Sequence, residues 1–194
     1  MSVYAWHFTD GNKLRDGSPL PAVGETLKFD GEPLLCKQGL HASLHPFDAL
    51  KYAPGDTLHL VHCAGIILHQ DDKLVCTERT IIASFEASEM LRYFARMQAL
   101  SVIHLAPENM AGLVEDWIMT GDETIRSAAD SAAYSAACSA ARSAAYSAAY
   151  SAADSAARSA AYSAATSAAR QSFADLVYEC FEGPMENVGF AGHP

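Results

Sequence analysis

The chain has 194 residues and a formal net charge of −10, with 13 Lys and Arg residues against 23 Asp and Glu residues. This length suffices for one buried hydrophobic core, and an acidic chain repels phosphate backbones, which argues against direct binding of nucleic acid. The first residues lack the basic and apolar regions of a secretory signal peptide, and no apolar run is long enough to span a bilayer. We therefore expect a cytoplasmic protein without a membrane span.

Neither the cysteines nor the histidines are spaced as metal ligands. The five cysteines are odd in number and include no C-x-x-C pair, which argues against a disulfide framework and a structural zinc site. His41 and His45 lie four residues apart, but Pro46 follows directly and disfavours a helix across both. His59 and His62 lie three apart in an expected strand and should point to opposite faces. These residues predict no metal site and no bound cofactor.

The first 86 residues are rich in β-forming residues separated by turns. We expect a strand at the N-terminus and another near residues 26–29, then one short helix, then runs of alternating residues. The helix should begin at Pro46, which suits a first turn, and end before Pro54 and Gly55. The later strands are expected at residues 57–63, 66–69, 74–76 and 80–85.

Helical periodicity replaces alternation after residue 86. Apolar residues at spacings of three and four predict helices at residues 90–100 and 108–119. A further amphipathic helix is predicted at residues 173–181, and Gly183 and Pro184 should end it.

Between these helices one four-residue word, Ser-Ala-Ala-X, recurs eleven times without interruption from Ser127 to Arg170. Alanine is the strongest helix former and the run contains no Gly or Pro, so we expect it to be helical. Alanine also buries little area. The hydrophobic core must therefore come mainly from residues 1–126 and from the segment after Arg170.

The period of this word does not match an α-helix. Each four-residue step advances about 40° around a helix axis, so the X side chains spiral and complete a circle in about nine words. A straight isolated helix, a right-handed supercoil with partner helices, or several shorter packed helices would each accommodate this period. No enzyme active site needs such a run, which favours a role in assembly or binding.

The X positions carry side chains that are costly on a purely solvated helix. Tyrosine occupies four of the eleven X positions, and its large amphipathic ring favours contact with a partner surface. We therefore predict binding of a protein partner, or self-association, through the repeat. The residues expected to take part are Tyr134, Tyr146, Tyr150, Tyr162, Arg142 and Arg158.

Three segments resemble the layout of the ADP-ribosyltransferases: Trp6-His7-Phe8-Thr9, Gly39-Leu40-His41-Ala42-Ser43 and Ala49-Leu50-Lys51-Tyr52-Ala53. The resemblance implies a strand histidine on the nicotinamide ribose, a serine strand that leads into a helix, and a tyrosine that stacks on nicotinamide. The matching catalytic residues are His7, Ser43 and Tyr52, with Glu86 as the later acid that would polarise the ribose. This resemblance implies NAD as the cofactor. The chain departs from the family pattern because Glu86 lies in no recognisable catalytic strand motif and no arginine is placed to hold a pyrophosphate.

A second resemblance covers most of the chain. The order of these segments, followed by Asp71-Asp72-Lys73-Leu74-Val75 and then Ala-rich tetrads, is similar to a family of phage and prophage proteins without an assigned activity. It runs from Trp6 through the repeat and implies a viral or mobile-element setting, with the host cytoplasm as the compartment.

These observations predict an α+β fold in three parts. A small β-rich domain with packed helices covers residues 1–120, the Ser-Ala-Ala-X helical repeat covers 121–170, and an amphipathic C-terminal helix and tail cover 171–194. The leading hypothesis is a non-catalytic phage-type protein that binds a host or phage protein and thereby inhibits host defence. The alternatives are an ADP-ribosyltransferase-like enzyme that modifies a host target and a structural homo-oligomer.

Overall fold

The computed structural model describes residues 2–101, 108–122, 125 and 152–190. The chain forms two compact units. One, which we call the sheet unit, consists of Met1–Leu91 and Arg170–Pro194, and the other consists of Arg92–Ala169. The C-terminal segment thus shares a unit with the N-terminal strands, whereas the sequence-based division set it apart as a separate region.

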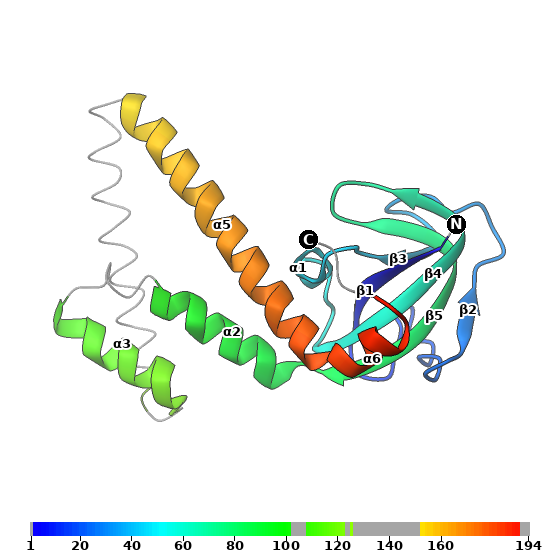
Figure 1. The fold of residues 1–194 in the computed structure, drawn as a ribbon, viewed down its shortest axis with the longest axis horizontal. Coiled ribbons are helices and arrows are strands. Elements are labelled where there is room, and N and C mark those ends of the chain that lie inside the picture. The colour runs from blue at the N-terminus through cyan, green and yellow to red at the C-terminus, as the bar shows by residue number, and fades with distance from the viewer. Residues whose placement is uncertain (1, 102–107, 123–124, 126–151, 191–194) are drawn as a thin grey trace. The chain divides into compact units, whose positions relative to one another are not determined.

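Antiparallel strands form the centre of the sheet unit. Its described strands are β1 (Val3–Thr9), β2 (Thr26–Lys28), β3 (Leu40–Ala42), β4 (Thr57–His69) and β5 (Leu74–Glu86). They form one sheet, in which β1 pairs with β4 and β4 pairs with β5 (Figure 1). Both β2 and β3 pair with β5, along successive stretches of that strand. This sheet and the helices described below confirm the α+β class.

The sequence divided the β4 and β5 regions into four short strands, and this division is wrong. Residues 57–69 form one strand, because a β-bulge between Ala64 and Ile67 lets the strand continue to pair with β5 on both sides of the expected break. Gly65 lies in this bulge with φ of 77°, and a Cβ atom there would lie 2.1 Å from Thr77 Oγ1. Only glycine fits this position without strain, so the residue that suggested a break instead permits continuous pairing.

The short helix predicted at Pro46 is confirmed as α1 (Pro46–Leu50). Pro46 occupies the first turn, where its missing N–H costs no hydrogen bond. His45 caps the helix because its Nδ1 accepts a hydrogen bond from the backbone N–H of Phe47 at 3.2 Å. Tyr52 follows directly after the C-cap residue of α1.

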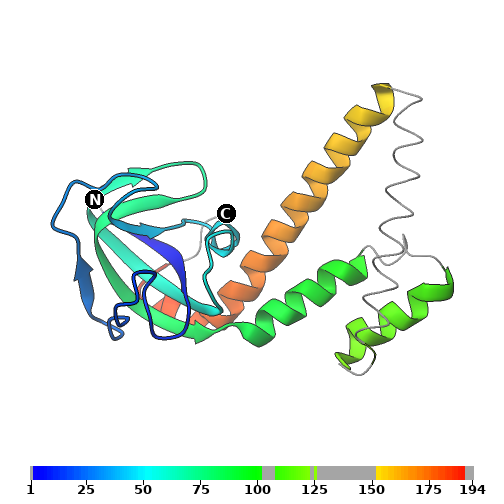
Figure 2. The ribbon, with the colours of Figure 1, turned by 180° about the vertical axis from the view of Figure 1, so that it is seen from behind.

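The C-terminal segment covers one face of the sheet. Alternation along β1 directs Trp6 and Phe8 to this face, where the Trp6 ring meets Phe181 edge-on with centroids 5.1 Å apart. Phe173 and Val177 at the end of α5 (Ala152–Cys180) are fully buried. Both views show this end of α5, and α6 after it, against the strands (Figure 1, Figure 2). The expected contribution of the chain after Arg170 to the core is confirmed.

The predicted end of the C-terminal helix is wrong in detail. α5 ends at Cys180, before Gly183 and Pro184, and α6 (Glu182–Asn187) then contains both residues. Pro184 is tolerated because it lies in the first turn of α6, where its absent N–H has no partner to lose.

The two helices predicted after residue 86 are confirmed as α2 (Ser88–Ser101) and α3 (Glu108–Thr120). α5 begins within the repeat at Ala152, and residues 126–151, with Tyr134, Arg142, Tyr146 and Tyr150, lie outside the described residues. The side chains of Arg158 and Tyr162 also lie outside the description. The predicted helicity of the whole repeat and its role in binding therefore stay predictions. Within the described ranges, no helix is both long and apolar enough to cross a membrane.

Candidate ligand-binding site

A cavity of about 720 Å³ lies within the sheet unit. Its lining includes His7, Thr9 and Arg79, and also Trp6 and Phe8, which alternate with His7 and Thr9 along β1. Its walls come from β1, β2, β3, the turns before β2 and β3, the end of α1 with the chain after it, and the residue before β5 together with Arg79 in the middle of that strand.

Basic residues dominate the charge of this cavity. Among the described residues that line it are four cations and one carboxylate, namely Arg15, Lys37, Lys73 and Arg79 against Asp16. The chain as a whole has the opposite balance, with a net charge of −10. The cavity is therefore a local positive site in an acidic protein, and it should attract anions.

Arg79 is the most buried of these cations, with 6% of its surface exposed. Its Nη1 donates to the carbonyl oxygen of His41 at 2.6 Å, and within the described ranges no carboxylate forms a salt bridge with it. Burial lowers the pKa of Arg79, although an arginine side chain stays protonated in proteins. Placing a guanidinium in such a position without a counter-charge costs free energy.

His59 joins β1 to β5 beneath the cavity. The imidazole is fully buried, with Nε2 2.8 Å from Thr9 Oγ1 and Nδ1 2.8 Å from Ser84 Oγ. Burial first, and the charge of Arg79 second, lower the pKa of His59 to about 4. The imidazole is therefore neutral near pH 7, and only one of its two ring nitrogens carries a proton.

His7 lines the cavity beside this network, with its ring centroid 6.3 Å from that of His59. Burial, followed by the charges of Arg79, His59 and His41, holds the pKa of His7 well below its usual value. A neutral imidazole has one donor and one acceptor nitrogen. His7 can therefore hydrogen-bond a polar group of a ligand without adding positive charge.

Tyr52 contributes an aromatic ring to the cavity wall and is 41% exposed. Its hydroxyl donates to Asp72 Oδ2 at 2.7 Å and accepts a hydrogen bond from Lys73 Nζ at 3.2 Å. Lys73 Nζ also lies 4.8 Å from the centroid of the same ring. Hydrogen bonds with Cys36 and with the Tyr52 hydroxyl raise the pKa of Lys73, so the ammonium stays charged at the cavity.

The structure brings together two of the four predicted catalytic residues. His7 and Tyr52 both line the cavity, although 45 positions separate them in the chain. Ser43 is 2% exposed and pairs through its backbone with Trp6, and it is absent from the described lining. Glu86 is also absent from that lining, because its Oε1 accepts from the backbone N–H of Ser88 at 2.9 Å at the start of α2.

Sequence reasoning missed Arg79, Lys73 and the other cations of the cavity. The usable signal was alternation along β5, because Arg79 and Ile81 are two residues apart and share a face. A charged residue in phase with a buried isoleucine indicates either a salt bridge or a binding site. Four further lining residues would have been hard to find, because Arg15, Asp16, Cys36 and Lys37 lie in irregular turns.

The described side chains do not form an evident metal centre. Within the described ranges, no three His, Cys, Asp or Glu residues are grouped so that they could hold an ion. The cysteines at positions 36, 63, 76 and 180 are free thiols.

Comparison with known proteins gives one family similarity. Residues 8–93 match the family model of a domain of unknown function, DUF7666. No curated protein and no solved structure matches the chain significantly. The matched region runs from β1 to the start of α2 and contains most of the cavity wall, with His7 immediately before it. This part of the chain is therefore similar to a domain family whose description names no activity.

Proposed function

We propose that the sheet unit binds a small anionic molecule that carries a flat ring, and that the ligand is NAD or an ADP-ribose compound. The observation that carries the proposal is the buried Arg79 guanidinium, which lines the cavity and has no carboxylate partner among the described residues. The choice of ligand comes from the ADP-ribosyltransferase resemblance.

The buried guanidinium of Arg79 has no carboxylate counter-charge among the described residues. A buried cation is stable when it is paired and hydrogen-bonded, and a phosphate oxygen pair matches the planar fork of a guanidinium. Binding of an anion at Arg79 would provide this pairing inside the protein, where the interaction is stronger than in water. Lys73, Lys37 and Arg15 line the same cavity and would add attraction for a second charge, as in a pyrophosphate.

The shape and the remaining lining residues support a ring as the other part of the ligand. Cavities that hold small molecules usually measure about 300–1,000 Å³, and this cavity falls within that range. The Tyr52 ring would stack on a flat heterocycle, and neutral His7 would hydrogen-bond a ribose hydroxyl or an amide. Apolar side chains complete the wall: Phe8, Leu14, Leu27 and Phe29.

Transfer of ADP-ribose to a host target is the further step of this proposal. The NAD glycosidic bond would break and a bond from the ribose to the target would form, with nicotinamide as the leaving group. His7 and Tyr52 would orient the nicotinamide riboside. Glu86, the acid that the resemblance assigns to the ribose, instead accepts a hydrogen bond from the backbone N–H of Ser88 at the start of α2.

A second candidate is the phage-type binder of a host or phage protein. One contact favours it. Arg170, which occupies the last X position of the repeat, makes a bidentate ion pair with the buried carboxylate of Asp48. Arg142 and Arg158 occupy equivalent X positions and would bind carboxylates of a partner in the same way, with the X-position tyrosines beside them. Inhibition of host defence would follow from occupation of that partner.

Calorimetric titration tests the ligand directly. ADP-ribose and NAD should bind, and nicotinamide alone should bind far more weakly because it lacks the anion. Arg79→Met should reduce the affinity for ADP-ribose by at least about tenfold, the usual value of a charge-assisted hydrogen bond. Lys28→Gln removes an exposed cation that pairs with Glu78 outside the cavity, and it should bind ADP-ribose as the wild type does. Absence of binding by every ligand, or normal binding by Arg79→Met, would refute the proposal.

Intact-mass analysis of proteins captured from a host lysate separates the transfer step from the second candidate. A captured protein that gains the mass of one ADP-ribose only when NAD is present supports transfer. A stoichiometric partner of unchanged mass supports the binder and argues against transfer to that partner.

A further inference from the structure

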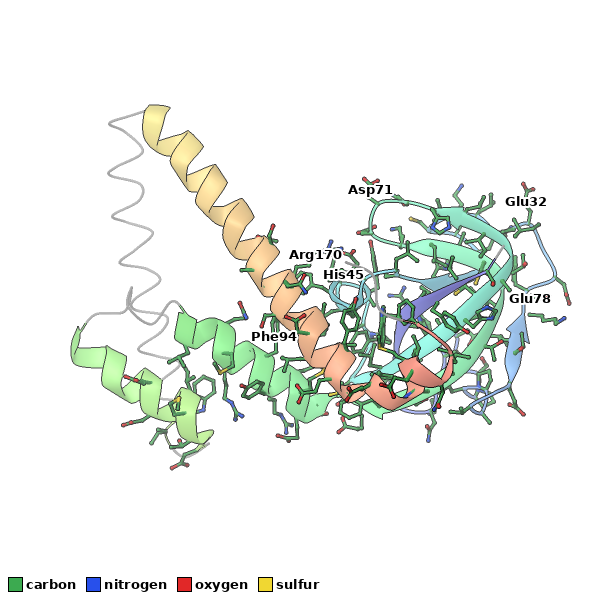
Figure 3. All side chains as sticks on the ribbon, in the orientation of Figure 1. Glu32, His45, Asp71, Glu78, Phe94 and Arg170 are labelled. Carbon is green, nitrogen blue, oxygen red and sulfur yellow. The ribbon has the colours of Figure 1, made fainter. Side chains whose placement is uncertain are left out.

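The last residue of the repeat, Arg170, contacts helix α1 through two hydrogen bonds. Arg170 Nη1 and Nη2 each lie 2.5 Å from one carboxylate oxygen of Asp48. Asp48 lies in α1 and is 3% exposed, whereas the Arg170 side chain is 35% exposed. Figure 3 shows Arg170 of α5 beside His45, the residue that caps α1.

The protonation state of Asp48 depends on its contact with Arg170. Burial would raise the pKa of this carboxyl, but hydrogen bonds from Arg170 and Lys51 outweigh burial and bring the pKa below its usual value. Without the guanidinium, Asp48 would keep one ion pair, with Lys51 Nζ at 3.1 Å. Lys51 is 49% exposed and would compensate the buried charge less well.

The same lysine continues the contacts toward the cavity. Lys51 Nζ lies 3.8 Å from Asp72 Oδ2. The same oxygen accepts a hydrogen bond from the Tyr52 hydroxyl at 2.7 Å. That hydroxyl in turn accepts from Lys73 Nζ. An uninterrupted series of ion pairs and hydrogen bonds therefore leads from the repeat to two residues of the cavity wall.

We propose that Arg170 is a positioning residue for the cavity and that it acts through Asp48 and Lys51 on Tyr52. This inference rests on the proposed function, because the position of Tyr52 matters when a ligand ring stacks on it. When the guanidinium is lost, Lys51 can move toward Asp48 and away from Asp72. Asp72 then loses the ion pair that fixes its carboxylate, so its hydrogen bond positions the Tyr52 hydroxyl less firmly. Arg170, at the end of the repeat, thereby influences the geometry of a binding site that it does not line.

A double-mutant cycle tests the route. Calorimetric titration with NAD, whose nicotinamide ring is the group assigned to Tyr52, compares the wild type, Arg170→Gln, Tyr52→Phe and the double variant. Each single variant should bind about threefold more weakly, the scale expected of partly exposed ion pairs. The double variant should lose no more than Tyr52→Phe alone, because the Arg170 effect passes through the Tyr52 hydroxyl. Two losses that multiply, or an unaffected Arg170→Gln, would overturn the inference.

Two further variants exclude a general effect on folding. Arg170→Lys keeps the charge but forms at most one of the two contacts, so it should restore part of the lost affinity. Lys28→Gln removes a different exposed ion pair of the sheet unit and should bind NAD normally. Equal losses in Lys28→Gln and Arg170→Gln would show that the effect is not specific to this route.

A ligand-independent measurement keeps the two proposals separable. The backbone N–H groups of Lys51 and Tyr52 donate to the carbonyls of Asp48 and Ala49, so their hydrogen exchange reports on the end of α1. Exchange at these amides should be faster in Arg170→Gln than in Lys28→Gln. If wild-type protein binds neither NAD nor ADP-ribose, the proposed function fails, and faster exchange would still support Arg170 as the residue that holds Tyr52. Equal exchange in the two variants would overturn that role whether or not the ligand binds.

Discussion

The His59 Nε2 atom donates its proton to Thr9 Oγ1, across 2.8 Å between two strands of the sheet. The direction of this hydrogen bond follows from the Thr9 hydroxyl. Thr9 Oγ1 donates its single proton to the carbonyl oxygen of Gly11, also at 2.8 Å, and can therefore only accept from His59. The neutral ring then accepts at Nδ1 from the Ser84 hydroxyl. All three side chains are satisfied while His59 stays neutral, and a second proton on the ring would displace the Ser84 donor.

This arrangement predicts a loss of stability at mildly acidic pH. The pKa of His59 is about 4 in the folded protein and about 6.5 in the unfolded chain, so the unfolded chain binds more protons between these values. The free energy of unfolding should therefore fall as the pH drops from about 6.5 to 4, by about 3 kcal/mol from this residue.

Urea unfolding at several pH values measures this slope. The stability of His59→Gln should depend less steeply on pH than that of the wild type over the window, because the titrating imidazole is gone. His7 also has a lowered pKa and adds to the slope of both proteins. Identical slopes in His59→Gln and the wild type would contradict the assignment.

Arg79 should contribute to ligand binding more than to folding. In Arg79→Met the removal of a buried charge should stabilise the fold, and the loss of the hydrogen bond to the His41 carbonyl should destabilise it. These opposite effects should leave the unfolding free energy within about 1 kcal/mol of the wild type. The increase in melting temperature caused by ADP-ribose should vanish in this variant. Thermal unfolding with and without ADP-ribose checks both statements. A strongly destabilised but still ligand-responsive Arg79→Met would identify Arg79 as a structural residue.

Tyr52→Ala should retain the fold and lose function. The side chain is 41% exposed, so its removal should change the unfolding free energy by no more than about 1 kcal/mol. NAD-dependent labelling of a target should be abolished, and affinity for NAD should fall by more than it does in Tyr52→Phe, which keeps the ring. Circular dichroism and titration on the same samples separate the two effects, and unchanged labelling in Tyr52→Ala would refute the role of this ring.

Gly65→Ala should destabilise the sheet unit by about 2 kcal/mol or more. An added Cβ would lie 2.1 Å from Thr77 Oγ1 on a backbone whose φ of 77° already excludes most side chains. Gly112→Ala is the matched control in α3, because nothing lies within 4 Å of a Cβ there and alanine favours a helix. Chemical unfolding should show a loss for the first variant and no loss for the second. A stable Gly65→Ala would mean that the bulge can move along β4.

Local patterns in the sequence were sufficient for much of the sheet unit. Pro46 marked the start of α1 because its ring favours a first helical turn, and apolar spacing marked α2 because it reports one buried helix face. Alternation also placed His59 and His62 on opposite faces, as confirmed by the contacts of His59 with Ser84 and of His62 with the Tyr4 ring. These features depend on residues a few positions apart, so the sequence by itself determined them.

The tertiary structure decided which residues form the site. Arg79 faces the cavity because of the register of β5 against β4, and that register shifts at two irregularities that alternation cannot locate. The same pairing brings His7 to the cavity that Tyr52 also lines, while Ser43 and Glu86 are used in backbone pairing and at the start of α2. Periodicity and propensity act within one element, whereas strand register, burial of charge and the covering of a sheet face depend on contacts between distant segments.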